Sequence, residues 1–337
     1  MGALRVGDFD GDGTFEAFFT AGATLASILA ADIDPSGTVT LRSEAIAANA
    51  NALDFDAGDV NGDGRTDLVI ASFEDQGTRV WFGEDAGLFR QGPVIAVGRA
   101  LQRIRLGDLD GDGDLDFAAV IRDSAQGLGE NVLFALGNGN GTFAISSPLD
   151  TLPGPGTAHD LRLADMDNDG QLDVVVLNDA ITRGDGSVVV LENDGGGVFG
   201  DAEMDKRGVV GQVSDSMAVG DLNGDGFVDV AVGQRLDAVV SVLLNDRDGG
   251  LLMRRNVAAG APDSLAIGDV DGDGDLDVIT SPGQILENVA SNGELVARAG
   301  GFTGGQLIGL ADLDDDRDLD VVSVGAGPDR VTVSRNE

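Results

Sequence analysis

The chain has 337 residues, of which 42% are hydrophobic, so it can bury a core although its formal net charge is −38. That charge excludes an ordinary basic surface for nucleic acid and argues against docking on an anionic membrane. With no Cys, no Tyr and one His, the chain lacks disulfides, thiolate chemistry and most side chains used in acid–base catalysis, so an enzyme is not expected.

The longest uncharged stretch spans residues 17–31. It is shorter than the ~20 residues that a bilayer-spanning helix needs. It also follows Glu16 rather than the basic segment of a signal peptide. The stretch therefore predicts two strands, and no membrane insertion is expected.

A nine-residue acidic loop recurs seven times along the chain. The third copy, residues 108–116, reads Asp-Leu-Asp-Gly-Asp-Gly-Asp-Leu-Asp, and the copies begin at residues 8, 59, 108, 165, 221, 269 and 312. Successive copies lie 43 to 57 residues apart. This period is typical of propeller blades and differs from the nonapeptide period of calcium-binding β-rolls.

Each repeat unit has the same plan of short apolar runs. In the third unit an alternating segment, residues 102–107, precedes the acidic loop, and apolar runs at 117–121 and 132–136 follow it. A fourth, more polar run ends a unit, as at residues 252–257. Runs of this length bounded by Gly, Asn and Asp are typical of strands, and the polar fourth run suits an outer edge.

These features predict an all-β fold in one domain, residues 1–337. We expect a seven-bladed β-propeller of four-stranded antiparallel blades, with the acidic loop between the first and second strand of each blade. The expected blades are residues 1–49, 50–99, 100–155, 156–211, 212–260, 261–303 and 304–337.

The acidic loops place side-chain oxygens at positions 1, 3, 5 and 9, and position 7 is expected to add a backbone carbonyl. The pattern resembles the start of an EF-hand loop, and hard oxygen donors with high negative charge favour Ca²⁺. A solvated acidic turn is the alternative for one copy, but seven matched copies favour up to seven structural Ca²⁺ ions. The predicted ligands are Asp8, Asp10, Asp12, Thr14, Glu16, Asp59, Asn61, Asp63, Arg65, Asp67, Asp108, Asp110, Asp112, Asp114, Asp116, Asp165, Asp167, Asp169, Gln171, Asp173, Asp221, Asn223, Asp225, Phe227, Asp229, Asp269, Asp271, Asp273, Asp275, Asp277, Asp312, Asp314, Asp316, Asp318 and Asp320.

The seven sites are not equal. The loops hold 30 acidic residues and two Arg, and so carry −28 of the net charge. Glu16 replaces the closing Asp of the first loop, and Arg317 occupies a Gly position of the seventh, where a left-handed backbone is strained. Asn61 and Asn223 are neutral ligands. We therefore expect the first and seventh sites to bind Ca²⁺ most weakly.

These loops resemble the FG-GAP/VCBS repeat family, which includes the head propeller of integrin alpha subunits. The resemblance rests on the pattern GD-(L/V/F)-(D/N)-G-D-G-x-x-D-(L/V) and covers essentially the whole chain. It implies a seven-bladed propeller with Ca²⁺ between the first two strands of a blade, held in the third copy by Asp108, Asp110, Asp112 and Asp116. All seven units carry the motif, which is closer to bacterial extracellular repeat proteins and fungal propeller lectins than to integrins. No spacing leaves room for a helical insertion domain, which argues against integrin-type metal-dependent ligand capture.

A meander order of strands places the acidic loops and the Gly-rich turns on one face of the propeller. The opposite face then carries the longer connections, and variable loops on a rigid scaffold are the usual place for recognition. We expect the ligand, an unknown protein or glycan, on that face. The connections concerned are residues 122–130, 152–159, 179–187, 233–238 and 325–330.

Three single features have both a plain and a sharper interpretation. The tripeptide Arg183-Gly184-Asp185 is an adhesion signal in integrin ligands, but chance explains it well in a chain of this composition. His159 is solitary and fits a surface or blade-junction position better than a catalytic one. Trp81, aligned with Leu133, fits packing between blades better than stacking on a sugar.

Two classes of function remain open at this point. The first is a non-catalytic, extracellular or cell-surface, calcium-binding propeller for adhesion or protein recognition, because weak oxygen-only sites fill at millimolar Ca²⁺. The second is a lectin, or a binding module of a polysaccharide-active protein. A lectin predicts aromatic side chains at similar offsets in several blades, and with one Trp and no Tyr that signature is weak.

The last blade is expected to be incomplete. Residues 331–333 align with a third strand, and too few residues follow to supply a fourth. Blade seven should therefore have three strands and an open edge, flanked by Arg330 and Arg335. We expect a monomer, with two alternatives: a weak contact between chains at that edge, or a longer natural protein whose further residues complete the blade.

Overall fold

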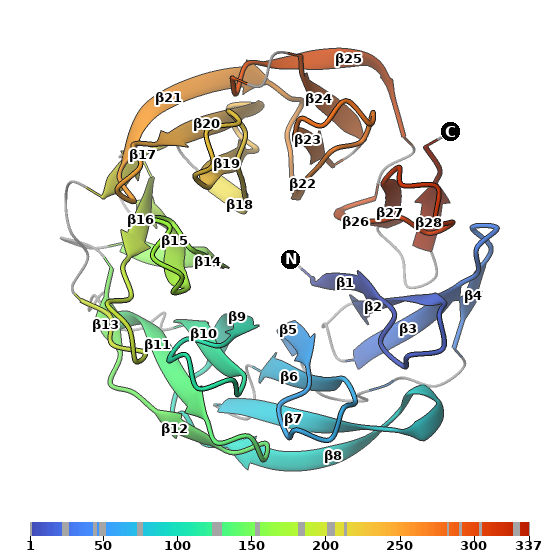
Figure 1. The fold of residues 1–337 in the computed structure, drawn as a ribbon, viewed down its shortest axis with the longest axis vertical. Helices are drawn as coiled ribbons and strands as arrows, with labels where there is room; N and C mark the ends of the chain where they lie inside the picture. The colour runs from blue at the N-terminus through green and yellow to red at the C-terminus, as the bar shows by residue number, and fades with distance from the viewer. Residues whose placement is uncertain are drawn as a thin grey trace.

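The computed structural model describes residues 2–21, 27–42, 46, 52–72, 77–122, 130–151, 156–180, 186–200, 206–211, 214–281, 283–289, 292–302, 305–325 and 331–336. Seven antiparallel sheets stand around a central axis like the blades of a propeller (Figure 1). Apart from one short 3-10 turn, η1 (Asp85–Gly87), the regular structure in these ranges is all strand. The described residues contain no helix long and apolar enough to cross a bilayer.

The first four blades contain strands β1 to β17. Blade one holds β1 (Leu4–Gly7), β2 (Phe15–Ala21), β3 (Ser27–Ile33) and β4 (Val39–Leu41). Blade two holds β5 (Ala52–Gly58), β6 (Asp67–Ser72), β7 (Gly77–Glu84) and β8 (Leu88–Ile95). Blade three holds β9 (Leu101–Gly107), β10 (Asp116–Ile121), β11 (Glu130–Gly137), β12 (Phe143–Ile145) and β13 (Leu149–Asp150). Blade four holds β14 (Gly156–Ala164), β15 (Asp173–Ala180), β16 (Ser187–Leu191) and β17 (Arg207–Val209).

The last three blades contain strands β18 to β28. Blade five holds β18 (Ser214–Gly220), β19 (Asp229–Gln234), β20 (Val239–Asn245) and β21 (Leu251–Ala258). Blade six holds β22 (Leu265–Gly268), β23 (Asp277–Thr280), β24 (Gln284–Asn288) and β25 (Leu295–Gly301). Blade seven holds β26 (Leu307–Ala311), β27 (Asp320–Val324) and β28 (Val331–Ser334).

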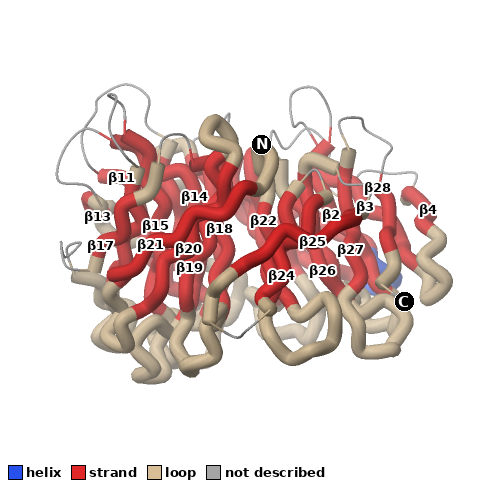
Figure 2. The backbone as a smooth tube through the Cα atoms, turned by 90° about the horizontal axis from the view of Figure 1, so that it is seen from above, coloured by secondary structure: helices blue, strands red, loops and turns tan. Residues whose placement is uncertain are grey.

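The strands of each blade follow one another in sequence order from the axis outwards. The first strands β1, β5, β9, β14, β18, β22 and β26 form the innermost ring, and neighbours in this ring contact one another (Figure 1). Because each acidic loop follows a first strand, all seven loops lie at the same end of the ring. Figure 2 shows these loops gathered along one face. The seven-bladed architecture predicted from the repeat is therefore confirmed.

Two blades depart from four strands. Blade three has five, because β12 and β13 pair in turn with the same neighbour, β11, where one outer strand was expected. Blade seven has three described strands, as predicted, with β28 at the edge. One expected connection is corrected as well. Strand β14 begins at Gly156 and pairs with β15, so only the first part of residues 152–159 is a connection.

The core is divided into seven wedges, one between each pair of neighbouring blades. One wedge joins Phe18 and Ile28 of blade one to Phe55 and Leu68 of blade two. Equivalent apolar clusters fill the next five junctions, and the seventh joins blade one to blade seven. The two-face-buried second strands explain the continuous apolar runs of the sequence.

Trp81 packs in the wedge between blades one and two, which confirms the packing interpretation. Its register differs from the prediction, however. Trp81 pairs with Leu68 of the second strand. Phe117 is the residue of blade three that is equivalent to Leu68, and it pairs with Ala135, so Trp81 is equivalent to Ala135 and not to Leu133. The alignment by sequence was therefore two residues out, which keeps the side chain on the same face of the strand.

Candidate metal-binding loops

All seven acidic loops have one backbone shape. Positions 4 and 6 adopt positive φ angles, as in Gly111 (77°) and Gly113 (92°) of the third loop. Glycine adopts this conformation without a steric penalty. The seventh loop reaches the same shape with Asp315 (61°) and Arg317 (79°). The left-handed backbone expected at Arg317 is therefore confirmed.

The carboxylates at positions 1 and 5 shape the loop by accepting backbone N–H groups. In all seven copies one oxygen of the position 1 Asp accepts the N–H of position 6, at 2.7–3.1 Å. In all seven the position 5 Asp accepts the N–H of position 7, at 2.8–3.1 Å. The position 7 backbone therefore folds against position 5. Its carbonyl oxygen remains a predicted ligand.

The residue at position 9 fastens the loop to its blade. One of its oxygens accepts the N–H of position 2 in every copy, for example from Leu109 to Asp116 at 2.7 Å. In blades two to seven its other oxygen accepts the N–H at the end of the third strand, as from Gly137 to Asp116 at 2.6 Å. The closing Asp is thus a structural residue as well as a candidate ligand.

Burial of these closing carboxylates changes their protonation. Burial raises the pKa of Asp67, Asp173, Asp229 and Asp277 to about 6, although two backbone N–H groups act on each of them in the opposite direction. The other carboxylates of the same loop add to the rise. A bound cation would favour the ionised form of these carboxylates, because it would compensate the negative charge that each loop concentrates.

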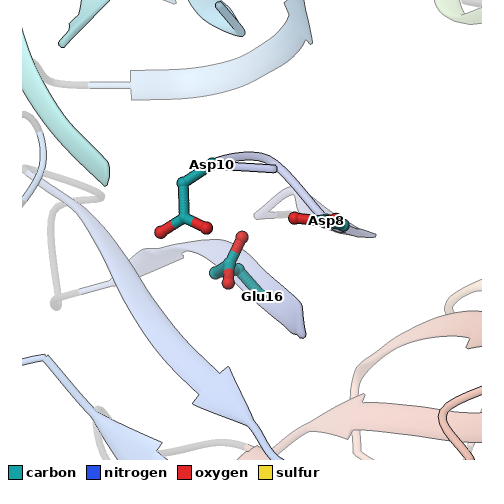
Figure 3. A group of neighbouring side chains, drawn as sticks. All are labelled: Asp8, Asp10 and Glu16. Atoms are coloured by element: carbon teal, nitrogen blue, oxygen red, sulfur yellow. The ribbon is translucent and has the colours of Figure 1, made fainter. Parts of the chain in front are cut away.

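In five loops, three carboxylates each offer an oxygen within 4.8 Å of the others. Loops one, three and four use positions 1, 3 and 9, and loops six and seven use positions 1, 3 and 5. Figure 3 shows the first of these groups, in which the carboxylates of Asp10 and Glu16 face each other beside Asp8. Loops two and five carry Asn61 and Asn223 at position 3. All-oxygen donor sets of this kind fit a hard divalent cation such as Ca²⁺.

The first loop departs from the others at Glu16. Glu16 Oε2 accepts the N–H of Phe9 at 2.8 Å, but Oε1 is buried without a hydrogen bond. The ladder between the second and third strands of blade one extends two residues further than in the other blades, to the pair Phe15 and Ile33. Glu16 therefore pairs with Asp32 within this ladder, whereas the closing Asp of the other blades precedes it. Burial raises the pKa of Glu16 to about 7.

Arginines contact the two loops that were expected to be weakest. Arg42 Nη2 lies 3.2 Å from Asp10 Oδ2 and 3.7 Å from Glu16 Oε1 in the first loop. Arg335 Nη1 lies 2.6 Å from Asp314 Oδ2 in the seventh. Each guanidinium competes with a metal for a predicted ligand. Arg247 makes a similar contact with Asp225 of the fifth loop, at 3.2 Å, so weak binding at the first and seventh sites stays a prediction.

One set of residues at the site was missed from the sequence. Asn193, Asn245 and Asn288 end the third strand region of blades four, five and six, and each donates its side-chain amide to two carbonyls. One carbonyl belongs to position 8 of its own loop and the other to position 2 of the preceding loop. Asn336 donates likewise to Val270. The recurrence of Asn after the third apolar run was the available signal.

The remaining single residues have these positions. His159 is half-buried on β14 at a bulge, consistent with a blade-junction residue. Arg183-Gly184-Asp185 lies outside the described residues, as do most of the long connections of that face.

Comparison with known proteins supports the fold. A sequence model of the FG-GAP-like repeat matches residues 59–119, 108–176 and 221–280. Among solved structures, an Agrocybe aegerita lectin that recognises non-reducing terminal N-acetylglucosamine superimposes with a TM-score of 0.60 and 22% identity, covering 88% of this chain and 79% of the lectin. BBS1N, solved in complex with ARL6DN, gives a TM-score of 0.63 and 9% identity, with coverage of 99% and 91%. Among curated proteins, no sequence matches the chain.

Proposed function

The chain belongs to the FG-GAP-like repeat family, and on that premise we propose that it is a non-catalytic, extracellular, calcium-binding β-propeller that serves as an adhesion or protein-recognition scaffold. The observation that supports this most is the recurrence of one loop geometry. Seven loops share the same backbone shape, and in five of them three carboxylates converge within 4.8 Å. Without a cation these groups repel one another.

The role of calcium in this proposal is structural. Extracellular oxygen-only sites have dissociation constants of about 10⁻⁴–10⁻³ M, so they fill outside cells and stay empty at cytosolic calcium levels. At about 1 mM Ca²⁺ and a constant of about 0.1 mM, each site adds roughly 1.4 kcal/mol to the free energy of unfolding. Several such sites together match the stability of a whole domain.

The ligand surface in this proposal is the face opposite the acidic loops. The loops are committed to metal and to backbone hydrogen bonds, whereas the other face carries the connections between second and third strands and between blades. The ligand is a protein in the favoured version of the proposal, and the propeller acts as a monomer.

Thermal unfolding with and without calcium tests the proposal. We expect the midpoint of the metal-free protein to rise by well over 10 °C in about 1 mM Ca²⁺, because several sites are filled together. Elemental analysis of the calcium-loaded protein should find several Ca²⁺ per chain. Equal midpoints with Ca²⁺ and with a chelator would contradict a structural role for the metal. Magnesium is the control, since its demand for octahedral geometry fits these loops less well.

A lectin is the second candidate, favoured by the likeness to the Agrocybe aegerita lectin. That likeness concerns the fold, and the specificity for N-acetylglucosamine belongs to the lectin alone. A glycan array in calcium buffer separates the two candidates. Saturable binding to a defined glycan, abolished by chelation, favours the lectin. No binding to any glycan on the array, together with capture of a cell-surface protein, favours the scaffold.

A further inference from the structure

Two tiers of residues occupy equivalent positions on the inner strands. In each blade one residue of the inner strand pairs with the closing carboxylate residue of the acidic loop. The upper tier lies four residues before that position, and the lower tier lies two residues before it. The upper tier consists of Ala3, Asp54, Arg103, Asp160, Ser216, Ser264 and Leu307. The lower tier consists of Arg5, Asp56, Arg105, Arg162, Ala218, Ala266 and Gly309. Charged residues thus come from blades one to four, and small or apolar residues from blades five to seven.

The small residues leave a cavity of about 100 Å³ on the axis. The charged residues of its lining are Arg5, Asp54, Arg103, Arg105, Asp160, Arg162 and Asp263. Its opposite wall includes Ser216, Ser264 and Leu307. The lining also includes Gly2, and Gly2, Asp263 and Ser264 precede the inner strands, whereas the acidic loops follow the strand ends. Arg5, Arg105 and Arg162 lie two residues before those ends. The cavity is therefore separate from the metal-binding loops and lies toward the opposite face.

The carboxylates of the cavity wall are used to join blades. Asp54 Oδ2 accepts the N–H of Ile104 at 3.2 Å and a bond from Arg105 Nη1 at 2.7 Å. Asp160 accepts the N–H of Met217 in the next blade at 3.2 Å. Both are almost fully buried. Asp263, at the rim, pairs with Arg235 at 3.4 Å.

The guanidinium groups are less fully matched. Four Arg face three Asp in the two tiers, so the cluster has one excess positive charge within a chain of net charge −38. Arg5 Nη2 is buried without a hydrogen bond and lies 3.6 Å from Asp54 Oδ1. On the opposite wall Ser216 Oγ is also buried without a partner. Burial lowers the pKa of Arg162, and although Asp160 acts in the opposite direction, the charges of Arg105 and Arg5 add to the lowering.

We propose that the axial cavity binds a small oxyanion, a carboxylate or a sulfate-type group, through the guanidinium groups of Arg5 and Arg162. Such an anion accepts the charge-assisted hydrogen bond that Arg5 Nη2 leaves unmade. It is attracted by the charge of Arg162, whose Nη1 donates to Asp160 at 2.7 Å, and it neutralises the excess charge of the cluster. The hydroxyl groups of Ser216 and Ser264 complete the far wall. The site does not depend on the identity of the partner or on the calcium loops.

Isothermal titration with sodium sulfate and with sodium acetate tests the site, in calcium buffer and with sodium chloride at matched ionic strength as the reference. We expect saturable binding of one anion per chain, and Arg162→Gln should weaken it at least tenfold. Arg90→Gln is the matched control, because Arg90 is exposed on the outer strand β8. Its affinity should equal that of the wild type.

A second variant keeps the test decisive if Arg162→Gln does not fold. Ser264→Leu fills the cavity from the neutral wall and leaves every ion pair in place, and Leu307 shows that this tier holds a leucine. We expect a folded protein that no longer binds the anion. A wild-type titration without saturable binding, or full affinity in both variants, would overturn the proposal. A preference for sulfate or acetate identifies the acid group of the natural ligand.

Discussion

The side-chain amide of Asn245 donates to the backbone carbonyl of Met166 at 2.7 Å, and so joins blade five to the acidic loop of blade four. The same amide donates to Val228 at 3.0 Å, and the backbone N–H of Asn245 donates to Asp229 at 2.8 Å. One residue therefore contacts two consecutive loops. Because Asn193 and Asn288 repeat the arrangement, the loops of blades three to six are linked in a chain.

Replacing Asn245 with alanine should destabilise the protein by about 2–3 kcal/mol, because one buried and one partly buried carbonyl lose their donor. Urea unfolding in saturating calcium measures this loss. Asn138→Ala is the control, since Asn138 is exposed and its amide serves only its own turn. If both variants unfold at the same urea concentration, the hydrogen bonds of Asn245 between the two loops do not contribute to the free energy of unfolding.

Replacing Arg317 with glycine should stabilise the seventh loop. Arg317 has a φ of 79°, which costs a non-glycine residue about 1–2 kcal/mol, while glycine adds some entropy to the unfolded chain. We expect a net gain of about 0.5–1 kcal/mol and tighter calcium binding at this site. Calorimetric titration and thermal melts measure the two effects. Unaltered calcium affinity in Arg317→Gly would show that backbone strain does not limit the site.

Acid should stabilise the metal-free protein before it destabilises it. The closing carboxylates Asp67, Asp173, Asp229 and Asp277 have pKa values of about 6 when folded, above the ordinary 3.8. Their contribution to stability is complete below pH 3.8 and is lost as the pH rises through about 6. The melting midpoint of the metal-free protein should therefore rise between about pH 7 and pH 5.

Calcium should reverse that trend, because the ion binds ionised carboxylates and its affinity falls on protonation. Melting curves across this pH range, in metal-free buffer and in about 1 mM Ca²⁺, measure both slopes. A fall in midpoint on acidification of the metal-free protein would contradict the assignment of these carboxylates.

Removing Asp54 should be costly. Burial opposes ionisation of Asp54, but Arg105, Arg5 and Arg103 outweigh it and hold its pKa at about 2. Asp54→Ala removes the carboxylate that Arg5 and Arg105 share and leaves them with Asp56 and Asp160 as partners, and we expect a loss of about 3–5 kcal/mol in urea unfolding. This stability is present above pH 3.8 and is lost as the pH falls toward about 2. Asp85→Ala, which breaks the exposed pair with Arg65, should leave the unfolding curve unchanged.

The repeat made the blades predictable from sequence. A loop with Asp or Asn at fixed positions recurs at each first turn, so counting the loops counts the blades. Positive φ at Gly113 and its equivalents follows from the same spacing, because a tight turn requires glycine there. Even the substitution at Arg317 could be identified as strained before the backbone was seen.

Contacts between blades were not predictable in the same way. The amide of Asn245 reaches Met166 across 79 residues, and nothing local in the sequence indicates which carbonyl it meets. The alternation of Arg103 and Arg105 marked a strand, but only the closed ring shows that these side chains face the axis. The fifth strand of blade three was not predicted, because the sequence does not show that the outer run divides into β12 and β13.

The wedge between blades one and seven has a consequence for the order of folding. Six wedges join blades that are consecutive in the chain, with separations of roughly 50 residues, whereas Arg335 of blade seven reaches Pro35 of blade one across 300 residues. Closing a loop of that length costs about 1.6 kcal/mol more in chain entropy than closing one of about 50 residues. The blades can therefore assemble in succession, and the contact that turns an open arc into a ring should form last and open first.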